Sequence, residues 1–222
     1  MAVSTEPRED QGIQSDVLAE LKWDARVKPN EIGVTVKDGI VTLTGWVDSY
    51  TKRWAAEEAA LRVRGVKAVA NDIDVRLSPL YERTDADIAG TAVYALESDA
   101  FVSVDNVELT VSKGWVTLKG EVEWQYQKED AEQVVRRLSG VKGVTNLVEI
   151  KPQAVPTNIK GQIEQALVRS AHVDAQRISV VVNGSKVALK GTVHSWAERE
   201  EAERQAWLAP GVASVDNQIA VR

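Results

Sequence analysis

The sequence predicts an α+β protein built from three tandem α-β-β-α-β domains, each a three-stranded mixed sheet covered on one face by two helices. Two repeated motifs support this prediction. A hairpin motif occurs as KDGIVTLTGWV, SKGWVTLKGEV and NGSKVALKGTV, and its closing glycine is Gly45, Gly120 or Gly191. A second motif, GVKAVAN, GVKGVTN or GVASVDN, begins 20 residues later in every copy. The copies are 75 and 71 residues apart, so each repeat has the size of a small domain, whereas solenoid units span about 20 to 50 residues.

The first element expected in each copy is an amphipathic helix. Apolar residues recur every four positions, which places them on one helical face; they are Ile13, Val17 and Leu21, then Ile88, Ala92 and Leu96, then Ile159, Ile163 and Leu167. The residues before these runs are expected to be N-caps, because their side-chain oxygens can accept hydrogen bonds from the first amides of a helix. They are Asp10, Thr84 or Asp85, and Thr157.

A β-hairpin is expected next in each copy. Alternating, β-branched segments predict its first strand at 32–36, 107–111 and 178–182. Gly39, Gly114 and Gly184 follow, and they can adopt the positive φ that a tight turn needs. In the returning strand of the first copy, Val41, Leu43, Gly45 and Val47 are expected to face the core.

The last two elements of each copy are a second helix and a third strand. The alanine-rich segment 53–61 favours a helix with small buried residues, which can pack closely on a sheet. Gly65, Gly140 and Gly211 fit the position just after such a helix, where left-handed geometry favours glycine. The final strands are expected at 69–75, 144–150 and 215–221. Each contains an asparagine for which a bulge or turn role is favoured over ligand contact: Asn71, Asn146 and Asn217.

These elements divide the chain into a tail at 1–11 and domains at 12–77, 84–151 and 157–222. The segments between the domains are short and contain proline, so the domains are expected to be neighbours. The glycines and asparagines named above are interpreted as residues of the fold.

The two motifs together resemble the BON domain, a family named for bacterial osmotic-shock and nodulation proteins. The resemblance rests on the glycine-closed hairpin and on the GVxxVxN signature, and it extends from about Ile13 to Arg222. It implies the α-β-β-α-β fold, an absence of catalysis, and a role in envelope or osmotic stress, often through phospholipid binding.

Composition and motifs narrow the possible functions. The net charge of −6 and a pI near 5.1 disfavour nucleic-acid binding, which depends on a basic surface. The absence of cysteine excludes thiolate metal sites, and no catalytic motif is visible, so neither a cofactor nor an enzymatic activity is expected. The N-terminus lacks a signal-peptide pattern, which predicts a cytoplasmic protein, or a periplasmic one if a leader was removed.

The expected activity is therefore binding, either to a phospholipid membrane surface or to a protein partner. Alternatives are self-assembly into a homo-oligomer and sensing of a small ligand or ion. All seven tryptophans lie at different repeat positions, and each has a polar residue at the same position in at least one other copy, which suggests surface or interface sites. The interface candidates are Trp46, Trp54, Trp23 and Trp124. The candidates for contact with lipid headgroups are Lys160, Arg169 and Arg177.

Overall fold

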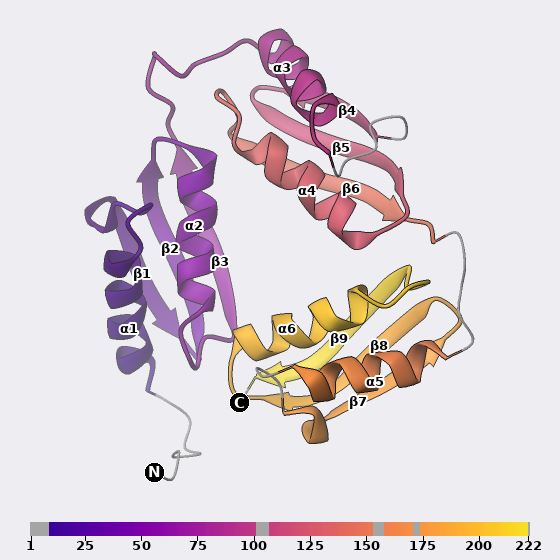
Figure 1. Cartoon of the computed structure of the whole chain (residues 1–222). Helices are drawn as coiled ribbons and strands as arrows, with labels where there is room; N and C mark the ends of the chain where they lie inside the picture. Colours follow the sequence, from indigo (N-terminus) through magenta and orange to yellow (C-terminus); the bar gives the residue numbers. More distant parts are fainter. Residues whose placement is uncertain (1–8, 101–106, 153–157, 171–173, 222) are drawn as a thin grey trace.

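A computed structural model describes residues 9–100, 107–152, 158–170 and 174–221 of the chain. Each domain has two α-helices and three strands in the predicted order (Figure 1), and the first and third domains also have a short 3-10 helix, Pro29–Glu31 and Ala175–Arg177. The first domain contains α1 (Asp10–Trp23), β1 (Ile32–Lys37), β2 (Ile40–Val47), α2 (Tyr50–Leu61) and β3 (Ala68–Val75). The second contains α3 (Asp85–Glu97), β4 (Val107–Ser112), β5 (Trp115–Val122), α4 (Gln125–Arg136) and β6 (Gly143–Ile150). The third contains α5 (Ile159–Arg169), β7 (Ile178–Asn183), β8 (Lys186–Val193), α6 (Trp196–Trp207) and β9 (Ser214–Val221).

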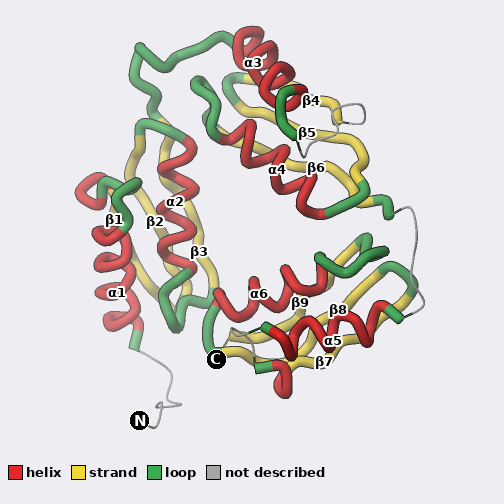
Figure 2. The backbone as a smooth tube through the Cα atoms, viewed as in Figure 1, coloured by secondary structure: helices red, strands yellow, loops and turns green. Residues whose placement is uncertain are grey.

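The three sheets share one topology, which confirms the predicted fold class. In each sheet the hairpin strands pair antiparallel and the third strand pairs parallel to the second, so the sheets are mixed. A parallel neighbour requires a crossover connection, and the second helix of each domain provides it. Both helices pack on the same face of the sheet and leave the other face uncovered (Figure 2).

Each domain has its own hydrophobic core between its helices and its sheet. The predicted stripe of α1, Ile13, Val17 and Leu21, is buried against the sheet. The buried face of α2 consists entirely of alanines, whose small side chains allow the helix to pack closely on β2 and β3. The sequence pattern therefore predicted the buried face of both helices.

The glycine positions that recur in all three copies adopt backbone conformations that favour glycine. Their φ values are positive, from 59° to 145°, at Gly39, Gly45, Gly65, Gly114, Gly120, Gly140, Gly184, Gly191 and Gly211. At Gly45 a β-carbon would lie 2.1 Å from the carbonyl oxygen of Glu31, and at Gly191 it would lie 2.0 Å from that of Arg177. The hairpin-closing glycine is therefore required by a close backbone approach as well as by its φ.

The helix starts differ in part from the prediction. Thr84 caps α3 as predicted, with its side chain accepting from the amide of Asp87. Asp10 was wrongly predicted as an N-cap, because it lies inside α1 and its carboxylate accepts from the amides of Asp38 and Gly39 in the hairpin turn, at 2.7 and 2.9 Å. Asp85 does the same for the turn of the second domain.

In the third domain, the predicted cap Thr157 lies outside the described residues. The cap that the structure shows for α5 is Asn158, whose side-chain oxygen accepts from the amide of Gly161.

The domains are arranged as a ring in which α2, α4 and α6 lie on the inner side and α1, α3 and α5 on the outer side (Figure 1). In this view the helices of all three domains lie in front of their sheets, so the three uncovered sheet faces point to the same side of the ring. The accessible surface is 12814 Å², compared with about 10,000 Å² expected for one compact domain of this mass. The molecule is therefore three small domains joined at limited junctions.

Candidate functional site

The junction between the first and second domains is built around Trp54 of α2. The guanidinium of Arg136, the last residue of α4, lies 3.8 Å from the centre of the Trp54 ring, and Arg26 of the first domain lies 5.9 Å from it. The side chain of Arg136 is only 13% exposed. A cation stacked on an indole and removed from water forms a strong cation–π contact. Trp54 is therefore an inter-domain contact residue.

The first turn of α2 completes this junction. Tyr50 packs against the core of the second domain, and the Thr51 hydroxyl donates to the carbonyl of Arg136 at 3.2 Å. Burial raises the pKa of the Tyr50 hydroxyl, which also has a hydrogen bond with the backbone of Val144. The start of α2 is thus held against the end of α4 and the start of β6.

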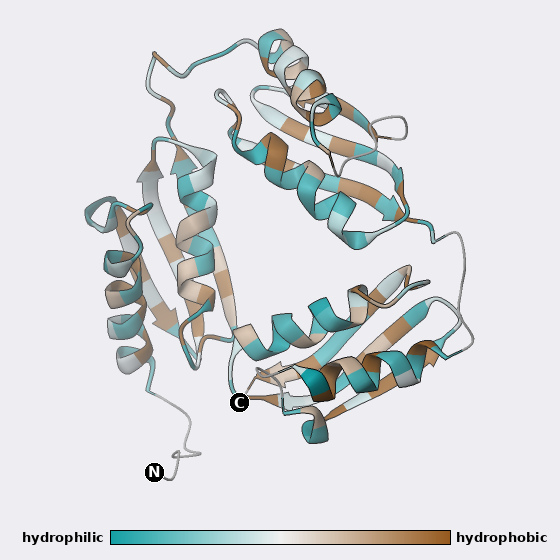
Figure 3. Cartoon of the chain, in the orientation of Figure 1, coloured by the Kyte–Doolittle hydropathy of each residue, from teal (hydrophilic) through white to brown (hydrophobic). Residues whose placement is uncertain are grey.

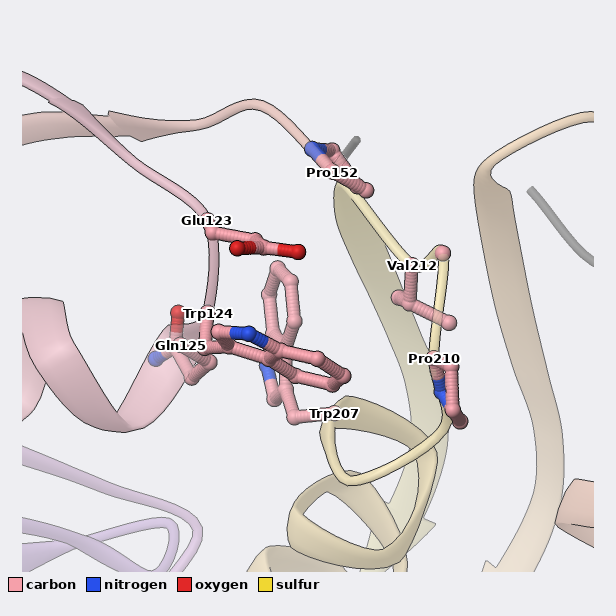
Figure 4. Close-up of a pocket in the computed structure, with 8 residues that line it drawn as sticks. Glu123, Trp124, Gln125, Pro152, Trp207, Pro210 and Val212 are labelled. Carbon is pink, nitrogen blue, oxygen red and sulfur yellow. The ribbon is translucent and has the colours of Figure 1, made fainter. Parts of the chain in front are cut away.

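The junction between the second and third domains pairs two tryptophans. Trp124 precedes α4, and Trp207, the last residue of α6, packs against the cores of both domains. The pKa of Arg204 is raised chiefly by its hydrogen bond and ion pair with Glu201 of the same helix, and the charge of Glu129 across the junction adds a smaller contribution. A cavity of about 100 Å³ lies at this junction (Figure 4); it is lined by Glu123, Trp124, Gln125, Pro152, Trp207, Pro210, Gly211 and Val212.

The junction between the third and first domains closes the ring. Trp196, the first residue of α6, packs against the core of the first domain. Its indole Nε1 is enclosed and has no hydrogen-bond partner among the residues that the structure describes. The carboxylate of Glu200 on α6 faces that of Glu58 on α2; partial burial, followed by this neighbouring charge, raises the pKa of Glu200. Like charges therefore meet at this junction, unlike at the second.

All three junctions repeat one geometry. The start of α2, α4 or α6 meets the end of α4, α6 or α2 respectively, so the inner helices follow one another around the ring (Figure 1). The residues at the starts are Tyr50, Gln125 and Trp196, and those at the ends are Leu61, Arg136 and Trp207. Such head-to-tail contacts form a closed ring when the rotation between units permits it. Here one chain supplies all three units.

Sequence analysis did not single out four residues of these junctions. Tyr50 and Arg136 were not considered, and Trp196 and Trp207 were included only in the set of seven tryptophans. A signal was present, because Tyr50 and Trp196 occupy the same repeat position, as do Arg136 and Trp207. Large side chains that recur at the two ends of the second helix indicate contacts made by those ends.

The recurring asparagines connect the second helix to the third strand. The amide nitrogen of Asn71 donates to the carbonyl of Arg53 at 3.2 Å and to the carboxylate of Glu57 at 2.9 Å, and its oxygen accepts from the amide of Ile73. Asn146 and Asn217 make the same three contacts in their own domains. The expected bulge or turn role was wrong; each asparagine lies within a regular strand and fixes the helix on the sheet.

Comparison with known families decides the identity of these domains. The profile described as "BON domain" matches the chain at residues 9–76, 84–152 and 157–222. The chain belongs to the BON domain family. The matched ranges cover each α-β-β-α-β unit, so all three domains of the ring are BON domains.

Among curated relatives, "Osmotically-inducible protein Y" of Escherichia coli (strain K12) is 30% identical over 149 residues, covering 64% of this chain and 73% of that protein. "Uncharacterized protein in gshII 5'region" of Anaplasma centrale is 30% identical over 125 residues, covering 55% of this chain and 83% of that protein. A solved structure of CdsD, described as a structural protein of the type III secretion system of Chlamydia trachomatis, aligns over 94% of this chain and 91% of that one, at 14% identity and a TM-score of 0.25.

The uncovered sheet faces of the BON domains present exposed aromatic rings. Trp46 on β2 is 38% exposed, with the guanidinium of Arg76 at 5.9 Å from its ring, and Trp115 on β5 is 43% exposed. The Trp115 Nε1 donates to the hydroxyl of Thr145 at 2.8 Å, which fixes the indole on the sheet. Trp23, at the end of α1 and 86% exposed, lies outside both the junctions and the sheet faces.

The three cations considered for lipid headgroups are not brought into one patch. Lys160 and Arg169 lie near opposite ends of α5, roughly 13 Å apart along its axis. Lys160 pairs with Glu164 at 3.7 Å, and Arg177 pairs with Asp174 at 3.1 Å and contacts the His194 ring at 2.9 Å. Two of these cations thus already have carboxylate partners within their own domain.

The described part of the chain shows neither a metal-binding cluster nor a membrane-spanning helix. No group of three or more His, Cys, Asp or Glu side chains there could hold a metal ion. His172 lies outside the described residues, and His194 is exposed. Within the described ranges, no helix combines the length and the apolar character needed to cross a membrane.

Proposed function

We propose that this chain is a non-catalytic protein of osmotic stress that binds a phospholipid membrane surface through the uncovered sheet faces of its three BON domains. The observation that carries the proposal is the shared direction of these faces (Figure 1). Because all three uncovered faces point to the same side of the ring, all three can contact one flat surface at the same time. The similarity to an osmotically inducible protein supports the stress setting.

The exposed indoles on these faces support a lipid surface as the target. Tryptophan is enriched where proteins meet the membrane interface, because its ring is largely apolar and its N–H is polar. Trp46 and Trp115 both lie on sheet faces and are partly exposed, and Leu147, on the same face of the second sheet as Trp115, is 52% exposed. These side chains can enter the headgroup region while the polar residues of the same sheet faces, such as Thr42, Thr44 and Thr117, stay hydrated.

Electrostatic attraction contributes little to this mode of binding. The chain carries a net charge of −6, and the sheet faces mix acidic with basic residues, such as Asp72 with Asp74 on β3 and Lys119 on β5. A basic residue near an anionic surface contributes about 1 kcal/mol, so a mixed face gains almost nothing from anionic lipid. Binding to neutral and to anionic vesicles should therefore be similar and insensitive to salt.

The arrangement argues against self-assembly through the BON junction surfaces. The ends of α2, α4 and α6 contact one another within one chain, so these surfaces are already occupied. A second copy would have to bind elsewhere or open the ring.

Vesicle co-sedimentation tests the proposal. The parent protein should sediment with phosphatidylcholine vesicles and with vesicles containing phosphatidylglycerol, and the Trp46→Ser/Trp115→Ser variant should remain in the supernatant. Trp23→Ser is the matched control, since it removes an exposed indole outside the sheet faces. Light scattering of the protein alone monitors self-association.

Two outcomes would contradict the membrane proposal. One is the absence of sedimentation with either vesicle, in which case a protein partner becomes the better target for the same faces. The other is a double variant that sediments as well as the parent.

A further inference from the structure

The cavity at the junction of the second and third domains has an unusual lining for so small a space. Two indoles border it, that of Trp124 from the second domain and that of Trp207 from the third (Figure 4). The carboxylate of Glu123 lies beside them on the same side of the cavity (Figure 4). The opposite wall consists of Pro152, Pro210 and Val212. Apart from the carboxylate, the side chains that border the space present mainly carbon.

Among the described residues that line the cavity, Glu123 is the one with a charged side chain. The Glu123 carboxylate has no ion-pair or hydrogen-bond partner among the described residues, whereas the Gln125 amide donates to Glu129 at 2.9 Å. The amides of Glu123 and Trp124 both donate to the side-chain oxygen of Gln127, at 3.1 and 3.0 Å. These two bonds fix the backbone that carries the carboxylate and the indole, so the lining is preorganised.

We propose that this cavity binds a small organic cation through a methylated ammonium group, of the kind found in choline. Indole faces attract cations through their negative π-surfaces, and quaternary ammonium groups are recognised by aromatic cages of this composition. The carboxylate balances the positive charge. A primary ammonium would need acceptors for three N–H donors, whereas a quaternary ammonium has no N–H to satisfy and suits a lining that is mainly carbon.

The first junction contains a comparable contact made with a cation of the protein itself. There the residue equivalent to Trp207 is Arg136, whose guanidinium stacks 3.8 Å from the Trp54 ring. At the second junction the equivalent residue is an indole, and no Lys or Arg is among the described residues that line the cavity, so a ligand can supply the cation there. The residues equivalent to Trp124 are Ser49 and Ser195, and therefore neither of the other junctions repeats this indole pair.

Calorimetric titration of the full chain with choline tests the site, with 3,3-dimethyl-1-butanol as the neutral ligand of the same shape. Choline should bind more tightly than the alcohol. Glu123→Gln keeps the shape of the side chain and should weaken choline binding about tenfold or more while leaving the alcohol unaffected. Trp124→Leu should also weaken choline binding, and Trp23→Leu, an exposed indole away from the cavity, should not. Circular dichroism verifies that each variant is folded.

The proposal is overturned if choline does not bind, if the alcohol binds equally well, or if Glu123→Gln binds choline as the parent does.

If choline binds, phosphatidylcholine vesicles distinguish a lipid headgroup from a free solute as the source of the ammonium group. Glu123→Gln should reduce vesicle binding only if the headgroup is the ligand. The site does not depend on the membrane proposal, because Trp46→Ser/Trp115→Ser leaves the cavity intact and should bind free choline normally.

Discussion

At the scale of single residues, the hairpin-closing glycines show how little room the fold leaves at its tightest point. The carbonyl of Glu31, just before β1, occupies the space where a β-carbon of Gly45 would lie. The φ of Gly45 is 117°, which L-residues rarely adopt. A side chain at this position is excluded by contact and by backbone geometry together.

We therefore expect Gly45→Val to destabilise the first domain by about 3 kcal/mol or more. The matched control is Gly90→Ala in α3, where an added β-carbon meets no atom within 4 Å, and which should stabilise its helix by up to about 1 kcal/mol. Thermal unfolding followed by circular dichroism measures both changes. A Gly45→Val protein with the parent's unfolding profile would contradict the steric argument.

Sequence analysis predicted the glycines better than the asparagines, for a physical reason. A positive φ is a local property, so a glycine at a turn or just after a helix can be recognised from its neighbours. The role of Asn71 depends on Arg53 and Glu57, which lie on another element and come within reach only after the helix has packed on the sheet. The fixed interval of 14 residues between the asparagine and a glutamate in all three copies was the available signal.

At the scale of elements, the ends of α2, α4 and α6 determine how neighbouring domains meet. The chemistry of these ends differs from one junction to the next, although the geometry is shared. The first junction stacks Arg136 on Trp54, the second places Glu129 opposite Arg204, and the third places Glu200 opposite Glu58. Each junction can therefore be perturbed independently.

Replacing Trp54 tests the first junction. Trp54→Ser removes the ring on which Arg136 stacks, and it should weaken the docking of the first two domains by about 1–2 kcal/mol. Limited proteolysis between residues 77 and 84 should accelerate, because the linker becomes more accessible when the domains separate. Trp46→Ser, a change on the sheet face of the same domain, should leave the cleavage rate at that of the parent. Equal rates for both variants would count against the stacking contact.

Replacing Glu200 tests the third junction and its pH dependence. Partial burial raises the pKa of both Glu58 and Glu200, so the two carboxylates bind protons more readily in the docked state. Their contribution to stability is therefore fully present at low pH and is lost as the pH rises through these raised pKa values. Arg26, Arg62, Arg136 and Arg199 surround the pair and reduce this effect without removing it.

Glu200→Gln should consequently raise the melting temperature modestly at pH 7 and leave it unchanged at pH 4. Glu129→Gln is the matched control, because it changes the same repeat position in the second domain, where the carboxylate faces Arg204. That variant should lower the melting temperature at pH 7. The repulsion argument fails if both substitutions shift the melting temperature in the same direction.

At the scale of the whole molecule, the ring is the feature that the sequence did not predict. The length and proline content of the linkers were sufficient to predict that consecutive domains are neighbours. Closure requires a third contact between domains that no linker joins, and its main residue, Trp196, has different counterparts, Tyr50 and Gln125, in the other copies. Periodicity reveals what the copies share, whereas docking depends on the positions at which they differ.

Small-angle X-ray scattering of a Trp196→Ser variant tests closure. Loss of the indole from the core of the first domain should open the third junction and increase the radius of gyration, while circular dichroism stays that of the parent. Trp115→Ser, on an uncovered sheet face, should leave the radius unchanged. A Trp196→Ser protein with the parent's scattering curve would show that this contact does not hold the ring closed.

Closure also places β9, the last described strand, near the first domain, which contains the first described helix of the chain (Figure 1 and Figure 3). The order of the domains along the polypeptide therefore does not determine which domains contact one another, because each domain contacts both of the others. A circular permutant that joins the present ends through a short peptide and begins at the second or third domain would retain all three junctions. In this permutant the third junction gains a covalent linker, and either the first or the second junction loses its own. If the permutant still forms the ring, the docking surfaces and not the linkers assemble it.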